Sequence, residues 1–203
     1  MKIGPRYKIA RRLGPDVFEK TQGPKFAARA AGRMDRKKKR PFSRSDFALQ
    51  LREKQRARMI YGMGERQFGR YVKQAEAKKT VRDDEMLYQS LETRLDNVIF
   101  RLHLAPSRQA SRQLVSHGHF AVNGVRVTIP SYGVKKGDVI TINSRSKNKV
   151  PLQNIADKVR DYEPPAWLRF DLIKSEGTVV GLPKLIKSEL PFNISAILEF
   201  YRR

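Results

Sequence analysis

Four arginines in the middle of the chain, Arg94, Arg101, Arg108 and Arg112, have the type and spacing needed to bind phosphate groups. A guanidinium group presents a planar fork of N–H donors that fits phosphate oxygens, and RNA binding needs several such groups at fixed spacing. Arg108 and Arg112 are four residues apart, so they are neighbours on the exposed side of any helix that contains both. We expect all four arginines to be available on the helical surface. Any one of them could instead be a solvated side chain or an ion-pair partner, and Arg94 and Asp96 are expected to have structural partners as well.

A second group of candidates lies at the two ends of the helix expected around this pair. Ser107 and Gln109 lie at its start, where free backbone N–H groups also attract phosphate. His117 and His119 lie at its end. Two histidines without a cysteine are too few for a metal site, so we expect them to cap the helix or to contact phosphate.

Basic residues of the first part of the chain complete the candidate set. In the helix expected over residues 45–61, four basic side chains spread around the cylinder, so some face RNA and others face a neighbouring element. The candidate RNA-binding residues are Arg11, Arg12, Arg36, Lys37, Lys38, Lys39, Arg40, Arg52, Lys54, Arg56, Arg58, Arg66, Arg70, Arg94, Arg101, Ser107, Arg108, Gln109, Arg112, His117 and His119.

The total charge points to a polyanionic partner. The 203 residues include 43 Lys and Arg against 20 Asp and Glu, a formal net charge of +23. Such a charge opposes compaction unless a polyanion neutralises it, and nucleic acid is the usual polyanion. Residues 1–82 hold 25 basic and 7 acidic side chains, a net charge of +18, which leaves +5 for residues 83–203. The first part is therefore expected to make the main electrostatic contact, although some soluble proteins are simply basic.

Composition excludes several classes of protein. The chain has no cysteine, so it forms neither a disulfide framework nor a thiolate metal site. No stretch approaches the roughly 18 to 20 consecutive apolar residues that a membrane-spanning helix needs. Because the sequence contains no Gly-rich phosphate loop, Cys/His pair or Ser/His/Asp arrangement, we expect no catalytic residue, no cofactor and no metal.

The amino-terminal part of the chain, residues 1–42, is rich in Gly, Pro, Lys and Arg and ends in the basic run 36–40. We find no apolar helical stripe there that could pack on a core. The sequence therefore predicts an extended basic arm that is disordered alone and orders on phosphates. The run 36–40 by itself also fits a nuclear-localisation signal or a solvated tail.

Apolar periodicity predicts helices in the rest of the chain. They are expected over residues 45–61, about 65–79, 83–102, 107–117 and 194–201. Ser45 and Ser107 are suitable N-cap residues, and the stretch 83–102 is the strongest single helix. The last segment, 194–201, is expected to be a closing helix docked on the rest, although a strand is also possible.

Short strands follow the fourth of these helices. Residues 120–122 and 125–127 flank Asn123-Gly124, a pair that favours a tight hairpin. Further strands are expected at 139–142, from 164–168 and near 178–180. The sequence therefore predicts an α+β protein, with a helical domain and a small domain of two helices on a mainly antiparallel sheet. The predicted bounds are 1–42 for the arm, 43–92 completed by about 186–203 for the helical domain, and 93–185 for the RNA-binding domain.

With these segments the chain resembles the bacterial-type family of small-subunit ribosomal protein four. The similarity is clearest in Gln50–Gln55, Tyr61–Gly62 and Glu65–Phe68, which resemble that family's most recognisable stretch. The small RNA-binding module named after that protein resembles Arg94–Val98, Arg112–Gly118 and Val122–Gly124. Lesser matches at Gly4–Arg12 and Pro165–Leu168 extend the resemblance over nearly the whole chain.

The resemblance implies a two-domain protein that binds the five-way helical junction in the body of small-subunit ribosomal RNA. It further implies early binding during assembly and an influence on decoding accuracy. The implied partners are this RNA, neighbouring small-subunit proteins with protein five among them, and messenger RNA near the channel through which it enters. The expected location is the ribosome of the cytoplasm or of an organelle.

The chain departs from the family pattern at two places. Some members hold zinc with four cysteines near the start, and this chain has none. The family's Gly-Gln-His-Gly stretch corresponds here to Ala30–Arg33, so contacts made by that loop cannot be transferred.

Three other functions compete with this interpretation. Arg94-Leu95-Asp96 resembles the motif that carries the catalytic Asp of RNA pseudouridine synthases, but here it precedes the module and no catalytic domain of adequate length exists elsewhere. A free RNA chaperone would consist of little more than the module. Sequence-specific DNA binding would need a helix-turn-helix spacing or a dimer seam. We therefore expect a binding protein and not an enzyme, with a non-ribosomal RNA-binding or RNA-modifying protein as the alternative.

Overall fold

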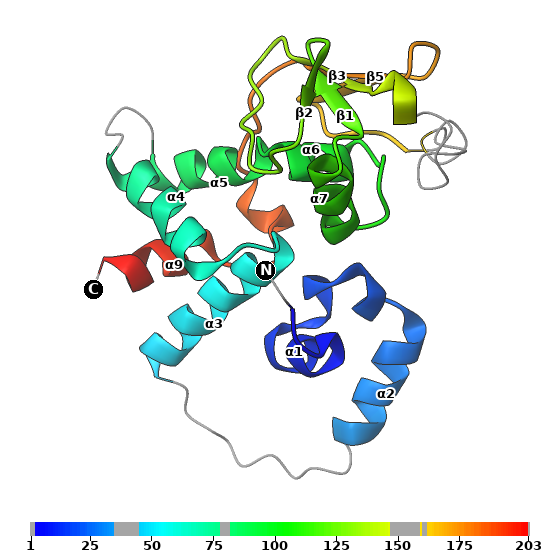
Figure 1. The fold of residues 1–203 in the computed structure, drawn as a ribbon. Helices are drawn as coiled ribbons and strands as arrows, with labels where there is room; N and C mark the ends of the chain where they lie inside the picture. Colours follow the sequence, from blue (N-terminus) through cyan, green and yellow to red (C-terminus); the bar gives the residue numbers. More distant parts are fainter. Residues whose placement is uncertain (1–2, 35–44, 78–81, 147–158, 160–161, 203) are drawn as a thin grey trace. The chain divides into compact units, whose positions relative to one another are not determined.

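The computed structural model describes residues 3–34, 45–77, 82–146, 159 and 162–202 of the chain. Among these residues, no helix combines the length and the apolar character that crossing a bilayer requires. The chain forms two compact units, one of Met1–Asp84 with Ile186–Arg203 and one of Glu85–Leu185. We call them the helical unit and the mixed unit, and each is described by itself (Figure 1).

The mixed unit is built on an antiparallel sheet. Its strands are β1 (Phe120–Val122), β2 (Val125–Val127), β3 (Val139–Ile142), β4 (Leu168–Asp171) and β5 (Glu176–Val179), in the order β2-β1-β3-β5-β4. The predicted hairpin between β1 and β2 is confirmed, because Asn123 and Gly124 both have positive φ angles, 51° and 79°. Strand β4 begins at Leu168, later than expected, because Pro164 and Pro165 have no N–H to donate to a ladder.

The prediction of a single helix over residues 83–102 is wrong. Two helices, α5 (Asp83–Glu92) and α6 (Leu95–Arg101), are separated by Arg94, which is extended and pairs with Gly133 in an isolated bridge. The backbone N–H groups of the next two residues donate to carbonyls within residues 130–132, at 2.8 and 3.1 Å. A segment more than thirty positions away in the sequence thus replaces helical hydrogen bonds at the break, and apolar periodicity does not report such bonds.

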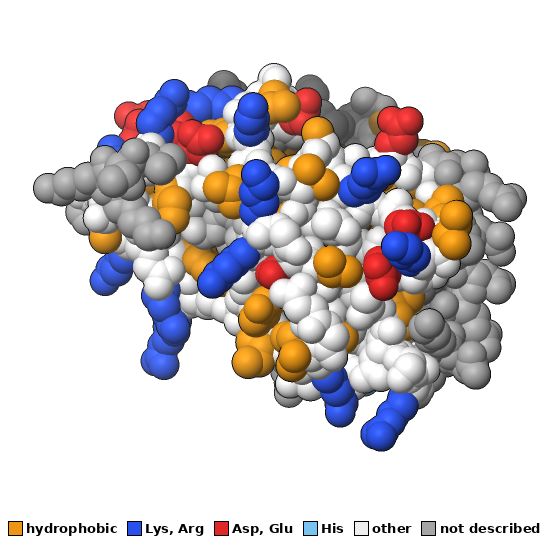
Figure 2. All heavy atoms as spheres, turned by 90° about the horizontal axis from the view of Figure 1, so that it is seen from above, with side chains coloured by type: hydrophobic (Ala, Val, Ile, Leu, Met, Phe, Trp, Pro, Cys, Tyr) orange, Lys and Arg blue, Asp and Glu red, His pale blue; other side chains and the backbone are white. Residues whose placement is uncertain are grey.

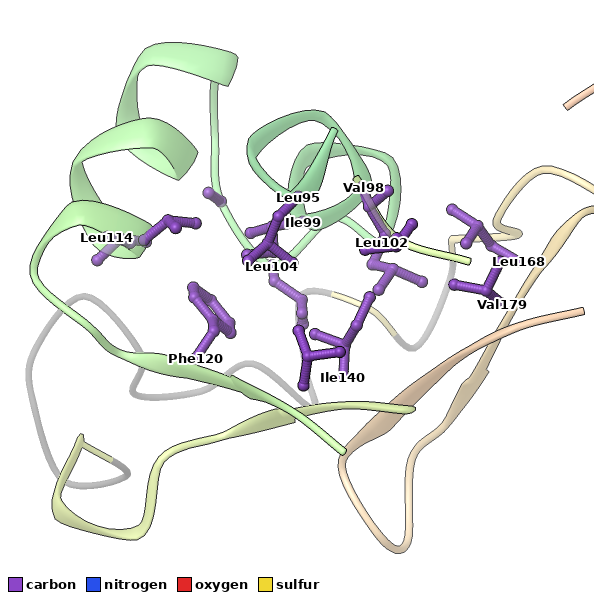
Figure 3. Close-up of a cluster of buried hydrophobic side chains, with 14 of the residues drawn as sticks. Leu95, Val98, Ile99, Leu102, Leu104, Leu114, Phe120, Ile140, Leu168 and Val179 are labelled. Carbon is purple, nitrogen blue, oxygen red and sulfur yellow. The ribbon is translucent and has the colours of Figure 1, made fainter. Parts of the chain in front are cut away.

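Helices α6 and α7 (Arg108–Ser116) pack on one face of the sheet (Figure 1). The predicted N-cap is confirmed, since Ser107 Oγ accepts the N–H of Ala110. The apolar core lies between these helices and the strands, and it includes Leu114 of α7, Phe120 of β1 and Ile140 of β3, with Leu114 next to Phe120 (Figure 3). Burial of each large apolar side chain contributes about 1.5–3 kcal/mol, so this core holds the two helices in fixed positions.

The helical unit is organised around α3 (Asp46–Ile60), α4 (Glu65–Ala77) and α9 (Ile194–Tyr201). Ser45 caps α3 as predicted, and the carboxyl-terminal segment is a helix rather than a strand. Helix α9 packs on α3 and α4. The α+β class predicted from the sequence is confirmed.

Residues 1–42 differ from the expected arm in the part that the structure describes. They form α1 (Arg6–Leu13), two short 3-10 turns, η1 (Pro15–Val17) and η2 (Glu19–Thr21), and α2 (Pro24–Met34). Ala10, Leu13 and Phe18 are at most 3% exposed, and α1 and η1 pack on α3. The expectation that no helix here packs on a core is wrong, because two apolar residues on an eight-residue helix are too few to give a visible stripe.

Glu65, at the start of α4, connects the three main helices of the helical unit. Its carboxylate accepts from Lys54 Nζ at 2.7 Å, from Arg58 Nη1 at 3.0 Å and from the hydroxyl of Tyr201 at 2.9 Å. Burial acts to raise the pKa of Glu65, but the hydrogen bonds from Lys54 and Tyr201 and the positive charges of Lys54 and Arg58 outweigh it and lower that pKa. Burial, together with the hydrogen bond to Glu65 and the charge on it, raises the pKa of Tyr201.

Replacing Glu65 by Gln is expected to lower the free energy of unfolding by about 1 kcal/mol at neutral pH, a modest effect because the side chain is partly exposed and screened. A carboxylate whose pKa is lowered on folding contributes stability above its unfolded pKa and loses it as pH falls through the folded value. The difference between wild type and Glu65→Gln should therefore shrink as pH drops below the ordinary value of 4.5. Urea unfolding at several pH values measures it. The control is Glu189→Gln, an exposed residue of the same unit; equal losses in both variants at neutral pH would contradict this role of Glu65.

Gly177 in β5 tests the packing of the mixed unit. A Cβ at this position would lie 2.4 Å from Cδ1 of Leu102, which is fully buried, so Gly177→Ala forces the core to shift. We expect a loss of about 1–3 kcal/mol in the free energy of unfolding, measured by urea denaturation. Gly181→Ala is the matched control, because nothing lies within 4 Å of a Cβ there. A Gly177→Ala protein as stable as the control would show that the sheet does not pack closely on Leu102.

Candidate nucleic-acid interface

Arg94 is buried, contrary to the expectation that it lies on the helical surface. It is 1% exposed, and its Nε and Nη2 donate to the two carboxylate oxygens of Asp96 at 3.0 and 2.6 Å. A buried guanidinium must be paired, and a carboxylate two residues away at the start of α6 provides the partner. The expectation of a structural partner for Arg94 is therefore met, and the expectation of exposure is wrong.

The next buried acid, Glu92 at the end of α5, holds Arg101. Glu92 is fully buried and accepts from Nε and Nη2 of Arg101 at 2.8 and 2.9 Å. It also accepts from the side-chain amide of Asn97 at 3.0 Å, and the amide oxygen of Asn97 accepts from Nε of Arg108 at 2.8 Å. A continuous hydrogen-bonded chain thus runs from Arg101 through Glu92 and Asn97 to Arg108.

Two further contacts fix the outer arginines. The guanidinium of Arg108 lies over the ring of Phe100, 4.3 Å from its centroid. Nη1 of Arg112 lies 4.0 Å from Oδ2 of Asp96, the same carboxylate that binds Arg94. We call Arg101, Arg108 and Arg112 the arginine cluster. Each of the three is partly exposed. Each is also in contact with a buried acidic or amide side chain or with a neighbouring ring, so its rotamers are already restricted before an anion binds, and binding costs less side-chain entropy.

The remaining candidates on α7 lie at its two ends. The Ser107 hydroxyl accepts within the helix cap, and Gln109 is partly exposed beside it. At the other end His117 is exposed, whereas His119 is 6% exposed, with Nδ1 2.9 Å from the hydroxyl of Ser146.

The sequence-based reasoning missed Arg126 and Arg145. Both line a hollow of about 280 Å³ at the end of α7, together with His117 and Asn143. Nε and Nη2 of Arg126 donate to the carbonyls of Gly118 and His117 at 3.2 and 3.1 Å. Gly118 permits this approach because it has no Cβ; a Cβ at this position would collide with the guanidinium of Arg126. Its φ of +71° also favours glycine. The alternation Val125-Arg126-Val127 in a predicted strand is the signal that places this arginine on the face opposite to its neighbours.

The candidates of the helical unit fall into two groups. Arg11, Arg12, Arg66 and Arg70 are exposed. The other candidates that the structure describes in this unit are at least half-buried, and three of them have acidic partners: Lys54 and Arg58 bind Glu65, and Arg56 binds Asp16 at 2.6 Å. Arg52 belongs to this half-buried group. The run 36–40 lies outside the described residues.

Lys54 is the most enclosed of these basic side chains. It is 6% exposed, and its ammonium group lies 4.3 Å from the ring centroid of Phe200 and 5.6 Å from that of Tyr201. The spacing of basic residues in the sequence does not reveal these contacts, so it overestimated how accessible Lys54 is to RNA. On the face of the molecule in Figure 2, the Lys and Arg side chains that are described stand mostly singly among neutral and apolar surface.

Comparison with known proteins gives a consistent result along the chain. Residues 93–140 match the family described as the S4 domain, and residues 1–92 match the one described as the ribosomal protein S4/S9 N-terminal domain. The chain is 40% identical over 210 residues to the small ribosomal subunit protein uS4 of Chloroflexus aurantiacus, covering 99% of this chain and 98% of that protein. It is 41% identical over 207 residues to uS4 of Aquifex aeolicus, with the same coverage of 99% and 98%. It is 46% identical over 159 residues to uS4 of Pelotomaculum thermopropionicum, covering 78% and 76%.

Proposed function

The chain belongs to the uS4 family of small ribosomal subunit proteins, and on that premise we propose that it is a structural component of the subunit that binds small-subunit ribosomal RNA directly. The RNA site is a multi-helix junction. Binding there nucleates assembly of the subunit and contributes to the accuracy of translation.

The arginine cluster is the observation that carries the proposal. Double-helical RNA is recognised largely by shape and by its phosphates, so a binding protein needs cations at fixed positions more than it needs base-reading groups. The buried side chains of Glu92, Asn97 and Asp96 hold the cluster from below. A rigid set of guanidinium groups favours one arrangement of phosphates over others, which is what recognition of a junction requires.

Within this proposal the candidate residues have two kinds of role. Arg94, Lys54 and His119 are buried and act as positioning residues. The contacts are assigned to Arg11, Arg12, Arg36, Lys37, Lys38, Lys39, Arg40, Arg52, Arg56, Arg58, Arg66, Arg70, Arg101, Ser107, Arg108, Gln109, Arg112 and His117. We propose the domain bounds expected from the sequence: a basic extension over 1–42, which packs on α3 through α1 and η1, a helical domain over 43–92 completed by about 186–203, and an RNA-binding domain over 93–185.

The family is a structural one and not a class of enzymes. One local observation disfavours the RNA-modifying alternative. Asp96, which occupies the position of a catalytic Asp in the short matching motif, is 4% exposed, and both its oxygens accept from Arg94. A carboxylate engaged in this way is poorly placed to attack a nucleotide.

The proposed partners are small-subunit RNA, small-subunit protein five and messenger RNA near its point of entry, in a cytoplasmic or organellar ribosome. The direct test is a competition titration of the protein against a small-subunit RNA junction fragment, an unrelated structured RNA and duplex DNA over a range of salt concentrations. A preference for the junction that persists as salt rises supports the proposal. Equal affinities that all fall by about 10³-fold or more between about 50 and 200 mM salt would reduce the protein to a general polyanion binder.

Replacing Arg108 and Arg112 together by Gln is expected to weaken binding of the junction fragment roughly tenfold or more, because each charge-assisted contact contributes about 1 kcal/mol or more. The slope of log affinity against log salt should fall in magnitude by about two. The matched control is Arg169→Gln with Lys174→Gln, which removes the same charge from exposed positions of the same unit. Thermal unfolding checks that both proteins fold. An equal loss of affinity in the two double variants would remove the arginine cluster from the site.

A further inference from the structure

A second hollow, in the helical unit, has a chemistry that the proposed interface does not use. It has a volume of about 580 Å³ and lies between α1, η2 and α2. Its lining includes two aromatic side chains, Tyr7 and Phe26, and four cations, Arg11, Lys20, Lys25 and Arg29. The volume lies in the range of sites that hold small ligands, and one nucleotide fits within it.

The two rings form an exposed aromatic surface. The centroids of Tyr7 and Phe26 are 6.1 Å apart, and the ring planes are inclined by only 21°. Tyr7 is 47% exposed although it is a large ring next to other apolar surface. Nucleic-acid bases stack on open aromatic surfaces of this kind.

The four cations around the rings lack acidic partners. None of the residues that line the hollow is Asp or Glu, and none of the four cations forms an ion pair with any residue that the structure describes. Arg11 Nε donates only to the backbone carbonyl of Tyr7, at 3.1 Å, and Lys20 Nζ lies 6.0 Å from the ring centroid of Tyr7. Four neighbouring positive charges repel one another, and an anion in the hollow relieves that repulsion.

The two helices present these groups through ordinary helical spacing. In α1, Ala10 and Leu13 are buried, which leaves Tyr7 and Arg11, four residues apart, on the exposed side. In α2, Lys25 and Arg29 have the same spacing, and Phe26 is three residues before Arg29. Each helix therefore contributes one ring and at least one cation to the same hollow.

We propose that this hollow, which we call the α1–α2 cage, binds one unpaired nucleotide of RNA, with its base stacked on Tyr7 and Phe26 and its flanking phosphates on the four cations. The cage is independent of the arginine cluster in the mixed unit. The inference rests on the proposed function only in that ribosomal RNA supplies the nucleotide.

The test compares two variants of Tyr7 that have the same charge. Tyr7→Leu removes the ring, and Tyr7→Phe retains it. The probe is a fluorescently labelled hexamer of riboadenosine, titrated at fixed salt against the full-length protein. Tyr7→Leu is expected to bind about fivefold more weakly or worse, because stacking of a base on an aromatic ring contributes about that factor or more. Tyr7→Phe should bind as wild type does. Tyr132→Leu, which removes an exposed ring from the mixed unit, is the control and should have no effect.

Equal affinities of the Leu and Phe variants would overturn the cage, because the cations alone would then account for binding. Adenosine monophosphate is the competing arm. Competition by the monophosphate at the same concentration as the hexamer would overturn RNA as the source of the nucleotide. The junction titration is a separate measurement: loss of junction preference with a normal Tyr7 effect removes the proposed function and leaves the cage, whereas the reverse pattern removes the cage alone.

Discussion

Two buried carboxylates, Glu92 and Asp96, impose the main constraint on the mixed unit. An ionised carboxylate taken out of water costs several kcal/mol unless cations and hydrogen-bond donors replace its hydration, so each acid fixes the side chains around it. Glu92 does this with Arg101 and Asn97, and Asp96 does it with Arg94. The positions of these arginines are thereby fixed by buried side chains of the unit. The packing of α5 and α6 therefore determines where their guanidinium groups lie. The protein's large excess of positive charge makes these few internal acids more important than their number suggests.

In the helical unit, the carboxylate of Glu65 likewise fixes the side chains around it. This residue binds cations from α3 and the hydroxyl of Tyr201 from α9, so one carboxylate joins segments at opposite ends of the sequence. Its partners Lys54 and Arg58 lie on a helix whose basic residues spread around the cylinder. The side of that helix which faces α4 and α9 uses its charges for cohesion, and Arg56 of the same helix binds Asp16 of η1.

Features that depend on local chemistry were predictable from the sequence. The Asn123-Gly124 turn and the caps at Ser45 and Ser107 each follow from one or two residue types, and each is confirmed. Features that depend on distant partners were not. The break at Arg94 requires carbonyls from residues 130–132, and the burial of Arg94 and Lys54 requires acids whose positions only the fold determines. Composition also concealed α1, because a short helix that buries two residues leaves no periodic signal.

The junction between α5 and α6 has a consequence for the order in which the chain folds. The first N–H groups of α6 find their acceptors in residues 130–132, and the N–H of Val134 returns to the carbonyl of Thr93. While the chain is being synthesised, α6 therefore begins without its own amino-terminal hydrogen bonds until the chain through Val134 has been made. Closing a loop of this length costs chain entropy before the contacts that repay it exist. The completion of α6 is thus a long-range event, coupled to the arrival of the sheet on which it packs, and the helix and the sheet of the mixed unit mature together.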